Sequence, residues 1–159
     1  MSILRQVGAV LLLPFAVTIV VPALIVAWTG DVRFWWGSVS GVALLAIGLV
    51  LVVWTIRLFS TVGQGTLAPW DPPTKLVVLG PYRHVRNPMI SGVAFVLAGE
   101  AVLLGSPPLA LWFAAVVVVN AVYLPLVEER DLRRRFGEDY DLYAANVPRW
   151  FPRLRPWII

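Results

Sequence analysis

Three long stretches without charge constrain this chain more than any other feature of its sequence. Residues 6–30 and 34–56 contain no charged side chain, and residues 87–127 contain only Glu100. A helix needs about 20 apolar residues to cross the hydrocarbon core of a bilayer, so the first two stretches correspond to one span each and the third to two. We therefore predict an all-α polytopic membrane bundle, with spans near 7–28, 35–57, 88–104 and 109–127.

The composition excludes several other classes. With 59% hydrophobic and 14% charged residues, the chain is neither a water-soluble globule nor a disordered segment. The first span is too long for the apolar core of a cleaved signal and contains Pro14 and Pro22, so we expect it to be retained. The lack of cysteine excludes disulfides and thiolate metal sites, and His84 alone cannot form a histidine metal cluster. We expect no bound metal.

The distribution of basic residues predicts the orientation. Of the 13 Lys and Arg residues, only Arg33 lies outside the N-terminus, the loop between the second and third spans, and the segment after residue 127. By the positive-inside rule both termini and that loop are cytoplasmic. The net charge of +4 is then located near anionic lipid headgroups, and we expect no nucleic-acid partner. Residues 1–159 form one membrane domain, and its small size leaves open a homodimer.

The cytoplasmic loop of residues 58–87 is rich in proline and glycine and cannot form a continuous helix. Its apolar segment 76–79 is expected in the membrane interface. The glycine motif at 63–65 has no strand before it and does not support a soluble-type Rossmann site. Chemistry with a water-soluble cofactor is therefore expected to use this loop together with the segment 128–159.

Past residue 127 the sequence predicts an amphipathic helix on the membrane surface, bent near Gly137. The residues that recur at helical spacing are Leu132, Phe136, Tyr140, Tyr143 and Val147. In the tail that follows, prolines exclude a helix, and aromatic residues such as Trp150 alternate with arginines. Two interpretations of the tail stay open, an interfacial anchor and a lid over a site.

Two motifs give the chain a family resemblance. The run GPYRHVRNPM at 80–89, entering a span with Gly92, resembles the GPYRxxRHPxYxG signature of the isoprenylcysteine carboxyl methyltransferase and phospholipid methyltransferase superfamily. The run EERDLRRRFGEDYDLYAANVP at 128–148 is similar to that family's EExxLxxxFGxxYxxYxxxVP signature. The motifs occur in the family's order and each adjoins a span, so the resemblance is specific over residues 60–155.

The resemblance implies a membrane-embedded enzyme that uses S-adenosylmethionine to methylate a lipophilic or prenylated acceptor. In the prenylcysteine enzymes of the family, the cofactor is held by the loop before the first motif, by the motif's tyrosine and HPxY stretch, and by the first glutamate of the second motif. The corresponding positions in this chain are Lys75, Leu76, Val77, Tyr82, Asn87, Pro88, Met89, Ile90 and Glu128, with Gln64 as a further match to a loop glutamine.

Physical arguments independently favour part of this assignment. Asn87 before Pro88 is typical of the N-cap and first residue of a helix, whose N–H groups and dipole attract an anion such as the cofactor's carboxylate. Glu128 and Glu129 follow the fourth span, where the helix dipole disfavours acids, so we expect a cationic partner. The cofactor's ammonium and sulfonium supply this charge. The alternative partners are Arg86, Arg130 and Arg133.

Three positions depart from the family pattern. Asn87 replaces the histidine of RHP, Ile90 replaces the tyrosine of HPxY, and Leu124 replaces an arginine that meets the substrate carboxylate. Asparagine donates and accepts hydrogen bonds much as histidine does, whereas Ile90 lacks a hydroxyl. Because Leu124 carries no charge, a buried acceptor carboxylate would need Arg86 or a tail arginine as its partner.

The acceptor determines which residues are catalytic. A carboxylate is nucleophilic at neutral pH and needs only a cationic partner such as Arg86. A phospholipid amine is mostly protonated and needs a base, for which His84 and Glu129 are candidates. The catalytic candidates are therefore Arg86, Glu129 and His84. Carboxyl methylation is the first interpretation, and phospholipid N-methylation is the alternative within the enzyme class.

Two rival classes use no methyl donor. A small four-helix transporter would depend on Glu100, the one charge inside a span, and a non-catalytic scaffold could have arisen through Asn87, Ile90 and Leu124. We expect Glu100 to snorkel or to bond to a neighbouring span, and Asn120 to bond across the bundle. Binding of S-adenosylmethionine would separate the enzyme from both rivals.

Overall fold

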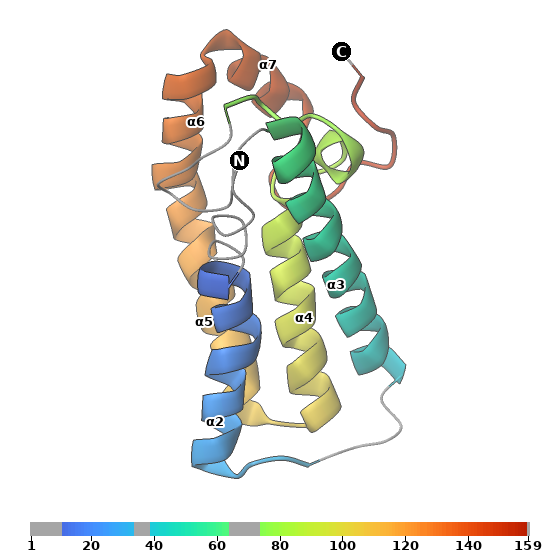
Figure 1. Ribbon diagram of the computed structural model, residues 1–159, viewed down its shortest axis with the longest axis vertical. Coiled ribbons are helices and arrows are strands. Elements are labelled where there is room, and N and C mark those ends of the chain that lie inside the picture. The colour runs from blue at the N-terminus through green and yellow to red at the C-terminus, as the bar shows by residue number, and fades with distance from the viewer. Residues whose placement is uncertain (1–10, 34–38, 64–73, 159) are drawn as a thin grey trace.

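The computed structural model describes residues 11–33, 39–63 and 74–158, with side chains from residue 14 onward, and all regular structure in these ranges is helical. Four apolar helical segments lie side by side in an elongated bundle, and shorter helices with the C-terminal tail cover one end, which we call the cap (Figure 1). The all-helical prediction is confirmed for these residues. Gln64 lies outside them, and its cofactor contact stays a prediction.

The four apolar segments overlap the ranges in which the sequence predicts spans. The first is the π-helix η1, Leu11–Val20, continued by α2, Val21–Thr29, and the second is α3, Val39–Leu58, continued by η2, Phe59–Gly63. The third is α4, Pro88–Leu104, and the fourth is α5, Pro107–Tyr123, continued by η4, Leu124–Glu128. The cap contains the 3-10 helix η3, Gly80–Arg83, with α6, Glu129–Phe136, and α7, Glu138–Asn146.

Two of the described helices, Val39–Gly63 and Pro107–Phe136, are long and apolar enough to cross a membrane. Pro14–Thr29 and Pro88–Leu104 are also apolar but shorter. At 1.5 Å per residue, the 17 residues of α4 extend about 26 Å. This length is slightly less than the roughly 30 Å of a bilayer's hydrocarbon core.

The contact between α3 and α4 is the most extensive between helices, and glycine makes it close. A Cβ atom on Gly48 would lie 2.7 Å from the backbone oxygen of Gly92, and one on Gly99 would lie 2.9 Å from the backbone oxygen of Gly41. The glycines are seven residues apart on both helices, so they share one face of each. Small residues in such a stripe let two helical backbones approach within van der Waals contact.

The fourth apolar helix extends further than the sequence predicts. α5, η4 and α6 form one continuous helix, Pro107–Phe136, so the chain after residue 127 first continues the apolar helix instead of starting a separate amphipathic one. Pro125 has no N–H to donate, and the π-helical turn accommodates it through a bond from the Glu129 N–H to the Leu124 oxygen. The bend at Gly137 is confirmed, because its φ of +56° separates α6 from α7.

Candidate functional site

Tyr82 lies at the centre of the cap. Its side chain is buried, and its ring centroid is 5.6 Å from that of Phe59 at the end of the second apolar segment. Burial raises the pKa of Tyr82 well above its ordinary value, and the nearby Tyr143 and Glu128 raise it further. The phenol is therefore neutral at physiological pH, and the influence of Glu128 indicates that its carboxylate lies near Tyr82.

Tyr143 of α7 joins the second sequence motif to the first. Its hydroxyl donates a 2.8 Å hydrogen bond to the backbone oxygen of Tyr82, and burial raises its pKa, so the donor keeps its proton. Tyr143 also packs with Tyr140 and Val147 in the buried cluster of the cap, against which Leu76 lies. The loop before the first motif is thus in contact with the helix of the second.

The N-terminus of α4 begins as the sequence predicts, with Asn87 at the N-cap and Pro88 as the first helical residue. The Asn87 side chain makes no capping hydrogen bond. It is only 9% exposed, and its amide nitrogen Nδ2 has no hydrogen-bond partner among the described residues. A buried donor without a partner is costly, so this amide, beside the first N–H groups of α4, is available to an acceptor atom of a ligand.

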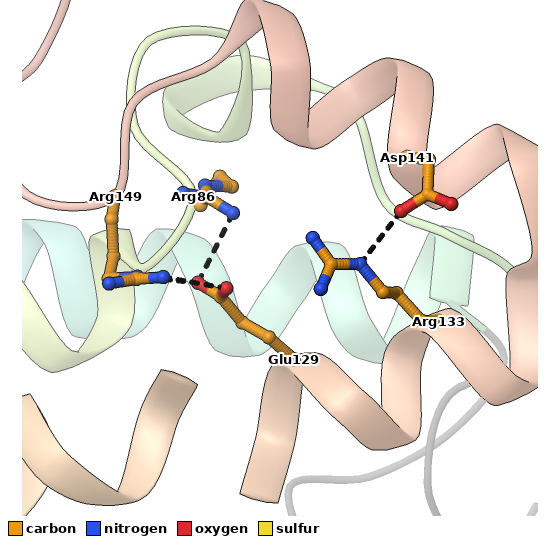
Figure 2. A network of polar contacts seen from close by, with 5 residues as sticks. All are labelled: Arg86, Glu129, Arg133, Asp141 and Arg149. Atoms are coloured by element: carbon orange, nitrogen blue, oxygen red, sulfur yellow. Dashed lines mark hydrogen bonds and ion pairs between the residues drawn. The ribbon is translucent and has the colours of Figure 1, made fainter. Parts of the chain in front are cut away.

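Glu129 connects three segments of the cap (Figure 2). Its side chain is 5% exposed and accepts two hydrogen bonds from Arg149, at 2.6 Å from Nε and 2.8 Å from Nη2. Arg86 Nη1 lies 3.2 Å from the same carboxylate. Arg86 Nε is buried with no partner in the described part of the chain. Two arginines share one carboxylate, so this network carries a net positive charge.

Glu128 adjoins Glu129 in sequence but has different surroundings. It is half-buried and forms no ion pair with any residue of the described ranges. Successive helical side chains point about 100° apart, so Glu129 reaches the arginines while Glu128 lies near Tyr82. Arg133, one of the expected alternative partners, pairs with Asp141 at 2.7 Å instead. Glu128 is therefore the carboxylate that can accept a cationic ligand.

The C-terminal tail folds back along the first motif. Three backbone hydrogen bonds attach it, from Arg86 to Pro148 at 2.9 Å, from Arg153 to His84 at 3.0 Å, and from Trp157 to Arg83 at 2.9 Å. Sequence reasoning missed Arg149, which adds its ion pair with Glu129 to this attachment. The one signal available was its position directly after the Val-Pro that ends the second motif.

His84 is oriented by the tail. Its Nδ1 lies 2.8 Å from the backbone oxygen of Arg153. A carbonyl oxygen can only accept, so Nδ1 carries the proton, and the lone pair of the neutral ring is on Nε2. His84 is half-buried and lines a cavity. In this tautomer Nε2 carries no proton and can accept one.

Two apolar cavities adjoin the site. The first, of about 460 Å³, lies between the end of α3, the first motif and the tail, and its lining includes Leu51, Trp54, His84, Pro88, Ser91 and Trp150. The second, of about 280 Å³, lies between α4 and α5, and its lining includes Leu44, Ile90, Ser91, Phe95, Phe113 and Trp150. Such walls suit the hydrocarbon part of an amphiphile.

The remaining predicted cofactor positions lie along the same loop and helix. Lys75 is exposed and its N–H donates to the Gly63 oxygen at 3.3 Å, whereas Val77 is buried. Met89 is half-buried in the first turn of α4, and Ile90 lines the second cavity. The structure thus brings the loop, the first motif and Glu128 together at one end of the bundle.

Two polar residues within the bundle lie apart from this cluster. Glu100 is twelve residues after Pro88, about 18 Å along α4, and its Oε2 is buried without a hydrogen-bond partner among the described residues. The Asn120 amide donates to the Val116 oxygen of its own helix at 2.8 Å. This bond replaces the predicted one across the bundle, because a short polar side chain can reach the backbone oxygen one turn earlier in its own helix.

Comparison with known proteins gives two matches. Residues 36–139 match the model of the phospholipid methyltransferase family. The chain is 31% identical over 132 residues to Protein-S-isoprenylcysteine O-methyltransferase B of Arabidopsis thaliana, an alignment that covers 80% of this chain and 66% of that relative. The chain therefore spans slightly less than two thirds of the relative's length. No solved structure matches the chain.

Proposed function

The chain belongs to the phospholipid methyltransferase family, and we propose that it is an integral membrane enzyme that methylates a lipophilic acceptor, with S-adenosylmethionine as the methyl donor. The observation that carries this proposal is the meeting of the two family motifs in the cap, through the Tyr143–Tyr82 hydrogen bond and the Arg86–Glu129 ion pair. The name of the relative refers to an isoprenylcysteine acceptor and to O-methylation. This supports a carboxylate on a prenylated or similar chain as the acceptor here.

The polar groups of the cap fit S-adenosylmethionine. The unpaired Nδ2 of Asn87 and the N-terminus of α4 are donors suited to the cofactor's carboxylate, and Glu128 is suited to its ammonium. When bound, this group supplies a methyl attached to a sulfonium, open to in-line displacement. Further contacts in this proposal come from Gln64, Lys75, Leu76, Val77, Tyr82, Pro88, Met89 and Ile90.

The chain itself contributes orientation and exclusion of water. An acceptor carboxylate needs no base, but it needs a cationic partner, which Leu124 cannot be. Arg86 can serve as this partner, because its Nε has no hydrogen-bond partner among the described residues and two arginines surround the single carboxylate of Glu129. Glu129 then acts by positioning Arg86. His84, with its proton on Nδ1, can accept a proton at Nε2 from an acceptor that carries one.

We further propose four membrane spans, with both termini and the cap on the cytoplasmic side. Arg33, the one basic residue expected on the opposite side, has its N–H bonded to the Leu104 oxygen at 2.8 Å, at the end of the bundle remote from the cap. α7 and the aromatic tail would then lie in the interface. The cavity between α4 and α5 offers the acceptor a sideways entry from the bilayer.

Transfer of a labelled methyl group tests the proposal. Purified protein in nanodiscs receives methyl-labelled S-adenosylmethionine with either an N-acetyl-S-farnesylcysteine or phosphatidylethanolamine. We expect label in the farnesylcysteine, as a methyl ester that releases methanol in base. Glu128→Gln should lower the transfer about tenfold when S-adenosylmethionine is below saturation, and the exposed Arg130→Gln serves as the matched control. Base-stable label in phosphatidylethanolamine would contradict the proposal that the acceptor is a carboxylate. If folded protein transferred label to neither acceptor, the proposal that the protein is a methyltransferase would be overturned.

A further inference from the structure

Trp150 is the large side chain that the two apolar cavities share. It contributes to the wall of the 460 Å³ cavity beside the first motif and to that of the 280 Å³ cavity between α4 and α5. Ser91 also belongs to both walls, but its hydroxyl donates to the Asn87 oxygen within α4. Of the two shared residues, Trp150 is therefore the one whose truncation would enlarge the cavities most.

The backbone around Trp150 is held on both sides. Before it, the Pro148 oxygen accepts from the Arg86 N–H, and the guanidinium of Arg149 is bonded twice to Glu129. After it, the Arg153 N–H donates to the His84 oxygen at 3.0 Å. A side chain whose backbone is fixed by neighbours on both sides is preorganised, so Trp150 presents a fixed surface to both cavities.

The lining of the second cavity suits a hydrocarbon chain. Aliphatic and aromatic side chains from α4 and α5 line it, and Ile90 connects it to the first turn of α4, where the candidate cofactor residues begin. The one amide in its wall, that of Asn120, already donates to Val116. An acceptor whose reacting group lies at the cap can therefore extend its chain along α4 and α5.

From this arrangement we propose that Trp150 determines acceptor specificity, by confining the acceptor's hydrocarbon part to the cavity between α4 and α5 and closing off the neighbouring cavity. The proposal rests on the proposed function, since the chain in question belongs to the methyl acceptor. Trp150 touches the hydrocarbon and not the reacting group. Its removal joins two spaces that are separate in the wild type, and longer chains gain room.

The test compares acceptors that share one headgroup and differ by one isoprene unit. The ratio of kcat/KM for S-geranylgeranylcysteine to that for S-farnesylcysteine should rise about tenfold in Trp150→Ala, the order by which apolar pockets discriminate extra methylenes. Trp150→Phe keeps most of the partition and should keep the wild-type ratio. Arg149→Gln removes two of the bonds that hold the backbone at Trp150, so it should shift the ratio in the same direction as Trp150→Ala but by less. An unchanged ratio in Trp150→Ala would overturn the proposal.

A binding measurement separates this inference from the proposed function. Native mass spectrometry of the protein with farnesol and geranylgeraniol reports occupancy without any methyl transfer. Trp150→Ala should raise the occupancy by geranylgeraniol relative to farnesol, whereas Trp150→Phe should not. A shift in occupancy without methyl transfer would overturn the proposed enzymatic function and support the proposal that Trp150 separates the cavities. Equal occupancy ratios in all three proteins would overturn the proposal about Trp150.

Discussion

The bundle and the cap are held together by different kinds of interaction. In the bundle, α3 and α4 approach through glycines, and the contact depends on backbone proximity and dispersion. In the cap, segments far apart in sequence are joined by the buried Glu129 network and by hydrogen bonds such as that from Tyr143 to Tyr82. A change in the bundle therefore acts on helix association, whereas a change in the cap acts on assembly of the site.

The largest expected effect is on the cap. Glu129→Ala leaves Arg86 buried without its counter-charge, and breaking a buried pair in this way costs about 3–5 kcal/mol. We expect a correspondingly lower free energy of unfolding in denaturant titration, with the tail becoming sensitive to protease. Glu128→Ala is the matched control, since Glu128 has no ion pair among the described residues. Equal decreases in the free energy of unfolding for the two variants would contradict the view that only Glu129 stabilises the cap through a buried ion pair.

The bundle is tested next, at its closest approach. In Gly48→Leu a side chain must enter a space where its Cβ would be 2.7 Å from the Gly92 oxygen, and overpacking of this kind costs about 1–3 kcal/mol. We expect a lower melting temperature in detergent. Ala46→Leu adds the same side chain to an exposed position of α3 and should melt like the wild type. If both variants melt alike, the glycine contact is not what holds the helices.

The same division explains how much of the fold the sequence could predict. The apolar helices could be predicted from the charge-free stretches, and α4 begins and ends at the predicted residues 88 and 104, because bundle helices are defined by local composition. The continuation of α5 into α6 could not be read in this way. Glu128 and the residues after it are polar enough to indicate a new element, yet the π-helical turn at Pro125 allows the helix to continue.

A smaller effect is expected at the bond between the two motifs. Tyr143→Phe removes the hydroxyl that donates to the Tyr82 oxygen and keeps the ring, so the loss is that of one hydrogen bond, about 1 kcal/mol. Tyr123→Phe, at an exposed position of α5, provides the control. We expect a lower melting temperature for the first variant alone. A matching decrease in Tyr123→Phe would show that the loss is not specific to the cap.

The smallest effect is expected on the exposed surface of the cap. Asp141→Asn breaks the 2.7 Å pair with Arg133, but both side chains are more than half exposed, and such pairs contribute little. The melting temperature should not change measurably, and added salt should not alter that result. A decrease in melting temperature as large as that of Glu129→Ala would mean that burial is not what distinguishes the Asp141–Arg133 pair from the ion pairs of Glu129.

The candidate site was less predictable than the fold, and the paired glutamates illustrate why. Sequence reasoning left Arg86, Arg130 and Arg133 as alternative partners, because helical spacing alone does not say which side chains face which segment. The folded cap brings Arg86 and the unforeseen Arg149 to Glu129, and Arg133 to Asp141. These pairings depend on how the tail returns to the first motif, and the return is set by backbone bonds that leave no pattern in the residue types.

Calorimetric titration with S-adenosylmethionine tests the central claim most directly. Detergent-purified wild type is compared with Glu128→Gln, which removes the unpaired carboxylate and keeps the size of the side chain, after both are shown to melt alike. We expect saturable binding by the wild type and a dissociation constant at least about tenfold higher for the variant, because one charge-assisted contact is lost. No binding by folded wild type, or equal affinity in the two proteins, would contradict it.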